Sequence, residues 1–145
     1  MITNVGNYEF LENILVKKNL KVTPQRLLIL SLIRQFGHLD IDELYAKITM
    51  DYPYISLATI YKNISTMVEN DILNEIKIGG AKTKYELSTN SHAHFICTEC
   101  KKIEDLDINV NCLLDNFDKG SVASVNVLIY GTCNACQSKK NQKLS

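Results

Sequence analysis

The segment His92-Ala93-His94-Phe95-Ile96-Cys97-Thr98-Glu99-Cys100 holds two of the three histidines and two of the five cysteines in the chain. One residue separates the histidines, so on a β-strand both imidazoles would lie on the same face. The cysteines form a CxxC motif, and a second CxxC, Cys133-Asn134-Ala135-Cys136, stands near the C-terminus. The sequence therefore predicts two metal sites that share this segment, one built on thiolates and one on imidazoles.

The composition is that of a globular protein with no global preference for nucleic acid. A chain of 145 residues suits one ordinary domain or two small ones, and its 16 basic and 16 acidic residues cancel. We find no apolar run long enough for a transmembrane helix and no N-terminal signal peptide. We therefore expect a cytoplasmic protein without membrane contact, in which paired cysteines bind metal more often than they form disulfides.

Helical periodicity dominates the first half of the chain, and each predicted helix has a recognisable start. Thr23, Asp40 and Ser56 are N-cap residues, and Pro24 fits the first position of a helix. The predicted helices span about residues 8–18, 24–36, 38–48 and 56–70, and two predicted strands, 72–78 and 83–87, flank the turn at Gly79-Gly80. Helices followed by a hairpin are typical of a winged helix-turn-helix, so we expect an α+β fold.

The polar stretch at about residues 88–91 predicts a hinge between domain 1–88 and domain 89–145. In the second domain the sequence predicts strands at 94–97, 102–107 and 122–130, a short helix at 110–118 and a frayed polar tail at 139–145. We therefore expect a DNA-binding unit followed by a small α/β unit.

The two CxxC pairs, Cys97 with Cys100 and Cys133 with Cys136, supply the four thiolates of a closed structural zinc site. A redox dithiol is the alternative, but it needs a single CxxC at a helix start and leaves the second pair unexplained. Cys112 stands alone and is expected to be a small core residue.

The three histidines, His38, His92 and His94, suggest a second site together with Glu86 and Asp105. Imidazole nitrogens and carboxylate oxygens suit Fe²⁺, Mn²⁺ or Zn²⁺. Such an ion would bridge the predicted domains and fix the angle between them. The alternative is that the histidines are ordinary structural residues.

The predicted helix at 56–70 could lie in the major groove of DNA. Thr59, Tyr61 and Lys62 lie on its polar face, and Arg26 belongs to a basic group that could contact phosphates. The alternative is a solvated face, because residues 1–88 carry ten basic and ten acidic residues.

These features together resemble the Fur (ferric uptake regulator) family of metal-dependent transcriptional repressors. The motifs that carry the resemblance are Thr23-Pro24-Gln25-Arg26, Ser56-Leu57-Ala58-Thr59-Ile60-Tyr61-Lys62-Asn63, Tyr85-Glu86-Leu87, His92-Ala93-His94, the two CxxC pairs and Tyr130-Gly131. The resemblance implies a homodimer rather than an enzyme, with an N-terminal winged helix and a C-terminal dimerisation domain.

The resemblance also implies roles for the candidate residues. The structural Zn²⁺ falls on the four paired cysteines, and a regulatory Fe²⁺ or Mn²⁺ falls on His38, Glu86, His92, His94 and Asp105. The metal-bound dimer is expected to close on double-stranded DNA at an AT-rich palindromic operator. Tyr61 matches the family's base-contacting tyrosine.

Two branches of the family remain open. Asp105 resembles the peroxide-sensing (PerR) members, whereas iron-sensing members mostly have glutamate there. The absence of a histidine at Ser124, Val125 and Asn126 also favours the peroxide branch. Glu86 departs from that branch, which usually has aspartate, and Glu104 would replace Asp105 as a ligand if the strand register shifted. A PerR-type peroxide regulator is thus the first hypothesis, and an iron-responsive repressor the second.

Overall fold

The computed structural model describes residues 8–88, 93–123 and 125–143. It divides into two compact units, Met1–Ser88 (unit 1) and Thr89–Ser145 (unit 2). The elements, in chain order, are α1 (Tyr8–Lys17), α2 (Pro24–Phe36), α3 (Ile41–Asp51), α4 (Leu57–Glu69), β1 (Leu73–Ile76), β2 (Lys84–Leu87), β3 (Ala93–Cys97), β4 (Ile103–Leu106), the 3₁₀ helix η1 (Val110–Leu114), β5 (Val127–Gly131) and α5 (Asn134–Lys143). None of the described helices has the length and apolar character that a bilayer span requires.

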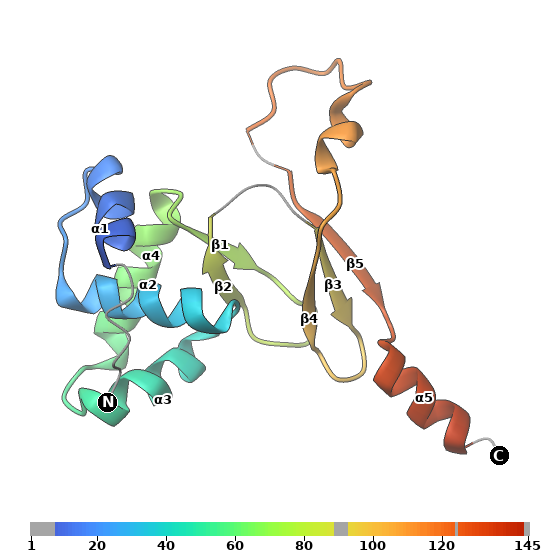
Figure 1. The fold of residues 1–145 in the computed structure, drawn as a ribbon, viewed down its shortest axis with the longest axis horizontal. Helices are drawn as coiled ribbons and strands as arrows, with labels where there is room; N and C mark the ends of the chain where they lie inside the picture. The colour runs from blue at the N-terminus through green and yellow to red at the C-terminus, as the bar shows by residue number, and fades with distance from the viewer. Residues whose placement is uncertain (1–7, 89–92, 124, 144–145) are drawn as a thin grey trace. The chain divides into compact units, whose positions relative to one another are not determined.

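Unit 1 is a winged helix-turn-helix in which four helices precede a two-stranded hairpin (Figure 1). The predicted N-caps are confirmed. The side chains of Thr23, Asp40 and Ser56 each accept a hydrogen bond from the backbone N–H three residues later in the chain. β1 and β2 pair antiparallel, with Leu73 opposite Leu87, and form the wing. The caps and the wing therefore follow the local sequence signals, and the α+β fold class is confirmed.

The apolar stripes of α1 to α4 meet in one core, to which the wing contributes Leu73 and Tyr85. Ile60, Ile64 and Met67 of α4 are fully or almost fully buried in that core. The same helix exposes Tyr61, a residue that is 59% exposed. Packing thus fixes α4 through one face and leaves the other face open to a partner.

Replacing Ile64 by alanine is expected to lower the free energy of unfolding of unit 1 by about 3 kcal/mol, because the lost methyl groups leave a cavity. Ile64→Val removes a single methyl group and should cost only about 1 kcal/mol. Urea denaturation of the zinc-loaded protein, followed by the far-UV circular dichroism of the helices, measures both values. Equal stabilities of the alanine variant and the wild type would contradict the packing described above.

Unit 2 is built on a three-stranded sheet of order β4-β3-β5 (Figure 1). β3 pairs antiparallel with β4, which places His94 opposite Asp105, and parallel with β5, which places Cys97 opposite Gly131. The central strand therefore carries one residue of each predicted metal site. Its register places Asp105 beside His94, and it places Gly131, two residues before Cys133, beside Cys97.

Four sequence predictions for unit 2 are corrected. Cys112, expected to be a small core residue, is exposed, and its thiol donates to the Asn109 carbonyl. The helix expected at 110–118 is a short 3₁₀ helix that ends at Leu114, because Val110 is its one buried residue and no apolar face continues. The strand expected at 122–130 begins only at Val127, since it pairs with a five-residue partner. The polar tail expected to fray from Lys139 instead belongs to α5 as far as Lys143. The predicted hinge, apart from Ser88, lies outside the described residues.

Candidate metal centres

The first CxxC lies in a tight turn at the end of β3. The Cys97 N–H donates to the Lys102 carbonyl at 3.0 Å, and the Lys101 N–H donates to the Cys97 carbonyl at 2.9 Å. Lys101 has φ 61°, the left-handed conformation that reverses the chain after the second cysteine. Cys97 is fully buried and Cys100 is exposed, so the turn directs one sulfur inward and the other toward the rim.

The second CxxC stands where β5 passes into α5. The Gln137 N–H donates to the Cys133 carbonyl at 2.9 Å, so Cys133 is at the N-terminus of the helix and Cys136 lies within the first turn. The parallel pairing of β3 with β5 brings this end next to the first turn, where the Thr98 N–H donates to the Gly131 carbonyl at 2.8 Å. Two distant parts of the chain thus meet at one point.

The four sulfur atoms of Cys97, Cys100, Cys133 and Cys136 all lie within 4.8 Å of one another. The Sγ atoms of Cys100 and Cys133 are 3.8 Å apart, close to the roughly 3.8 Å edge of a ZnS₄ tetrahedron with Zn–S bonds of about 2.3 Å. The cysteines are not joined as disulfides. Although Cys133 holds the helix-start position of a redox dithiol, convergence of four sulfurs is what a structural zinc site requires.

The ionisation of these thiols also fits a cation. The Cys133 N–H donates to the Cys97 Sγ at 3.3 Å, and this bond, with others from the first turn, lowers the pKa of Cys97 to about 6. Sharing a hydrogen with the Cys133 sulfur, together with burial, raises the pKa of Cys136 to about 12. Four adjacent thiols resist ionising together, and a divalent cation removes that resistance. The donor set therefore suits structural Zn²⁺.

A histidine–carboxylate pair lies in unit 1, between the α2–α3 connection and the wing. The Nε2 of His38 is 3.2 Å from the Oε2 of Glu86, and Glu86 is only 6% exposed. Leu39 and Tyr85 exchange both backbone hydrogen bonds, at 3.2 and 2.8 Å, in an isolated antiparallel bridge. This bridge joins the residue after His38 to the residue before Glu86, and so holds the two side chains together.

A second histidine–carboxylate pair lies in unit 2, across β3 and β4. The Nε2 of His94 is 3.4 Å from the Oδ1 of Asp105, and His94 is 6% exposed. Glu104 is opposite Phe95, and its carboxylate pairs with the Lys102 ammonium at 2.6 Å. The strand register therefore favours Asp105 over Glu104 as a ligand.

Each unit thus offers one imidazole nitrogen beside one carboxylate oxygen, a donor set that suits Fe²⁺ or Mn²⁺. His92, the fifth predicted ligand, lies outside the described residues. The sequence predicted these donors as ligands but gave no sign of the backbone bridge between Leu39 and Tyr85 that aligns one pair. In the sequence, the only sign of this bridge is that an apolar residue follows His38 and another precedes Glu86. That pattern is too common to predict a contact.

The predicted DNA-contacting residues divide into two kinds. Tyr61 and Lys62 are exposed on α4. Arg26 donates to the Asn63 Oδ1 at 3.3 Å and to the Lys21 carbonyl at 2.7 Å, and the Thr59 hydroxyl lies 2.8 Å from that of Ser56 at the helix cap. The first two side chains are open to a partner. Arg26 and Thr59 also organise α4 itself, a role that the sequence did not predict.

Comparisons with known proteins agree with this architecture. The sequence pattern of the Ferric uptake regulator family matches residues 17–119. A peroxide-responsive repressor PerR of Staphylococcus saprophyticus is 36% identical over 124 residues, which cover 82% of this chain and 84% of the relative.

Two solved structures are also similar. The Campylobacter jejuni peroxide stress regulator aligns with a TM-score of 0.72 at 35% identity, covering 88% of this chain and 97% of the other. The ferric uptake regulator from Francisella tularensis with iron aligns with a TM-score of 0.67 at 25% identity, covering 81% and 94%. The matches therefore extend over both units.

Proposed function

The chain belongs to the Ferric uptake regulator family, and from that premise we propose that it is a PerR-type repressor that senses hydrogen peroxide. The observation that carries the proposal is the presence of two donor sets of different chemistry, four converging thiols and one histidine–carboxylate pair in each unit. The relatives of similar length, such as the one from Staphylococcus saprophyticus, are named peroxide-responsive repressors. The chain is thus a regulator that binds DNA rather than an enzyme.

The four cysteines hold Zn²⁺ with no open coordination position, so this ion stabilises unit 2 and takes no part in sensing. His38 and Glu86 of unit 1, with His92, His94 and Asp105 of unit 2, hold the regulatory Fe²⁺ or Mn²⁺. Ligands from both units make that ion a link between them. The ion binds the DNA-binding conformation of the dimer more tightly than the other conformation. This difference in affinity shifts the equilibrium toward the conformation that fits DNA.

Fe²⁺, when bound, would activate H₂O₂ beside the ligand histidines, and an imidazole would supply the two electrons that reduce the peroxide. His38 and His92 are the ligands at which we expect the oxidation, with one peroxide oxygen inserted into the imidazole ring and the other leaving as water. An imidazole altered in this way is a poorer ligand, so the link between the units is lost. The repressor then leaves its operator, and the regulated genes are transcribed.

The dimer reads DNA through α4, which presents Tyr61 and Lys62 to the major groove. Two-fold symmetry of a homodimer requires a palindromic operator, which we propose is AT-rich. Unit 2 exposes large apolar side chains that a second copy would cover, namely Ile108, Leu113, Phe117, Ile129 and Tyr130. Because the charges of unit 1 cancel, the affinity for DNA must come more from specific contacts and from the two DNA-binding units of the dimer than from overall charge.

Mass spectrometry of the iron-loaded protein tests the proposal. Zinc-replete protein is loaded anaerobically with Fe²⁺, treated with micromolar H₂O₂, digested and weighed, while operator binding is followed in parallel. We expect His38 or His92 peptides heavier by one oxygen atom, together with loss of DNA binding. Protein loaded with Mn²⁺ is the control. Its mass should not change after peroxide, and it should stay bound to the operator.

An iron-responsive repressor is the alternative function, favoured by Glu86 where the peroxide-sensing branch usually has aspartate. The same experiment separates the two functions. Unmodified histidines and an operator that stays bound after peroxide would contradict the proposed peroxide-sensing function. Release of DNA on removal of Fe²⁺ alone would then support the iron-responsive one.

A further inference from the structure

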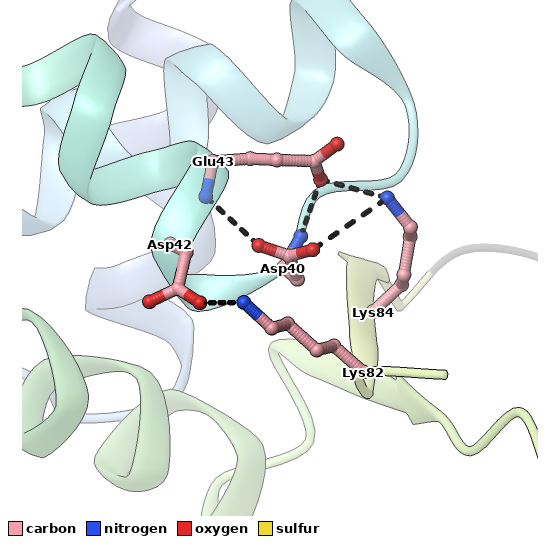
Figure 2. Close-up of polar contacts among 5 residues, drawn as sticks. All are labelled: Asp40, Asp42, Glu43, Lys82 and Lys84. Carbon is pink, nitrogen blue, oxygen red and sulfur yellow. Dashed lines mark hydrogen bonds and ion pairs between the residues drawn. The ribbon is translucent and has the colours of Figure 1, made fainter. Parts of the chain in front are cut away.

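A cluster of charged side chains joins the wing to the start of α3 (Figure 2). Asp40, Asp42 and Glu43 come from the N-terminus of α3. Lys84 is the first residue of β2, and Lys82 lies just before it in the connection between β1 and β2. The Lys84 ammonium is 2.7 Å from the Glu43 Oε2 and 3.9 Å from the Asp40 Oδ2, and Lys82 pairs with Asp42. The cluster thus contains two separate cross-links between the same two segments.

The two cross-links differ in how far they are removed from water. The side chains of Lys84, Asp40 and Glu43 are 21%, 13% and 43% exposed, whereas those of Lys82 and Asp42 are 67% and 58% exposed. Surface ion pairs contribute little, because solvent screens them and two long side chains must be ordered. Lys84 is therefore expected to hold the wing more firmly than Lys82.

The partners of Lys84 are themselves fixed by the start of α3. Asp40 and Glu43 form a capping box, in which the Glu43 N–H donates to the Asp40 Oδ1 and the Asp40 N–H donates to the Glu43 Oε2, both at 2.8 Å. The same Glu43 Oε2 accepts from the Lys84 ammonium (Figure 2). Burial raises the pKa of Glu43, but the hydrogen bonds from Lys84 and Asp40 outweigh it and leave the pKa lowered. Lys84 is thus anchored to a helix end, not to a mobile loop.

The anchor lies next to the histidine–carboxylate pair of unit 1. Asp40 is two residues after His38, and Lys84 is two residues before Glu86 on the same face of β2. The backbone bridge of Leu39 and Tyr85 lies between them. Three successive contacts therefore tie the α2–α3 connection to β2, and the pair proposed to hold the regulatory ion is the last of them.

We propose that Lys84 and Glu43 are positioning residues that hold His38 and Glu86 at the spacing that the regulatory metal requires. The proposal rests on the function proposed above, since it concerns the same ion. A two-stranded hairpin is only marginally stable by itself. The core holds β2 through Tyr85 on one face, and Lys84 anchors the other face, which carries Glu86. Partners beyond the direct ligands orient metal sites in this way, and their loss commonly costs about 10- to 100-fold in metal affinity.

The test measures the Mn²⁺ affinity of the zinc-loaded, full-length protein by competition with a fluorescent chelator. Lys84→Met and Glu43→Gln are each expected to weaken Mn²⁺ binding by about tenfold, whereas Lys84→Arg keeps the cation and restores most of the affinity. Lys82→Met is the matched control, because it removes the same charge from the same wing at the exposed pair. It should leave the affinity unchanged.

A purely structural role is separated by thermal denaturation of the same proteins without Mn²⁺. Glu43→Gln keeps the side-chain volume and still accepts the Asp40 N–H, so it should fold like the wild type even if Lys84→Met does not. Wild-type affinity in the Glu43→Gln variant, or an equal loss in Lys82→Met, would overturn the inference and leave the proposed function intact. A wild-type protein that holds zinc but no second metal would overturn both.

Discussion

Replacing Cys97 by serine is expected to leave a chain that holds no zinc and whose second unit does not fold. The buried apolar residues described in unit 2 are few, namely Ala93, Ile96, Cys97 and Val110. Helix α5 buries none of its residues, and its start carries Cys136 while its Lys140 pairs with Glu99 at 2.6 Å. Since so small a core supplies little stability, the zinc–thiolate bonds, about 10–16 kcal/mol in small zinc domains, must supply the rest.

The zinc content of the purified variant and its near-UV circular dichroism measure this outcome. Cys112→Ser is the matched control, because the Cys112 thiol is exposed, donates to the Asn109 carbonyl at 2.9 Å and lies outside the group of four sulfurs. That control should keep one zinc per chain and the wild-type spectrum. A Cys97→Ser protein with one zinc and a folded unit 2 would show that three thiolates suffice, and the structural role would be refuted.

The fold of unit 1 follows closely from sequence because its signals are local. The N-caps at Thr23, Asp40 and Ser56 and the apolar spacing of α4 need no knowledge of the rest of the chain. Unit 2 is less predictable because distant partners set its element lengths. β5 ends its pairing where β3 does, and α5 is a polar helix without an apolar face for periodicity to reveal.

The candidate sites show the same division. The CxxC pairs could be recognised from spacing alone, because a tight turn presents two sulfurs whatever surrounds it. The choice of Asp105 over Glu104 required the register of β3 with β4, since a shift of one residue exchanges their faces. The anchor of Lys84 on Glu43 joins segments about forty residues apart, and nothing in the local sequence of either marks the other.

Replacing His94 by alanine is expected to abolish Mn²⁺-dependent operator binding while leaving zinc content and fold intact. His94 is the second residue of β3 and its imidazole lies against Asp105, whereas Cys97 of the zinc site is at the other end of the strand. Loss of a direct ligand should weaken Mn²⁺ binding by more than about 100-fold, the upper end of what the loss of an outer partner costs. Without the ion no ligand favours the DNA-binding conformation of the dimer.

Fluorescence anisotropy of a labelled operator, titrated with protein at a fixed Mn²⁺ concentration, measures this effect. Glu104→Gln is the control, because it changes the neighbouring carboxylate on the opposite face of β4 and should bind the operator like the wild type. His92→Ala should behave like His94→Ala, since both histidines belong to the proposed ligand set. If the His94→Ala variant bound DNA normally at saturating Mn²⁺, the regulatory ion would not control DNA binding. If only Glu104→Gln failed, Glu104 would replace Asp105 as the ligand from β4.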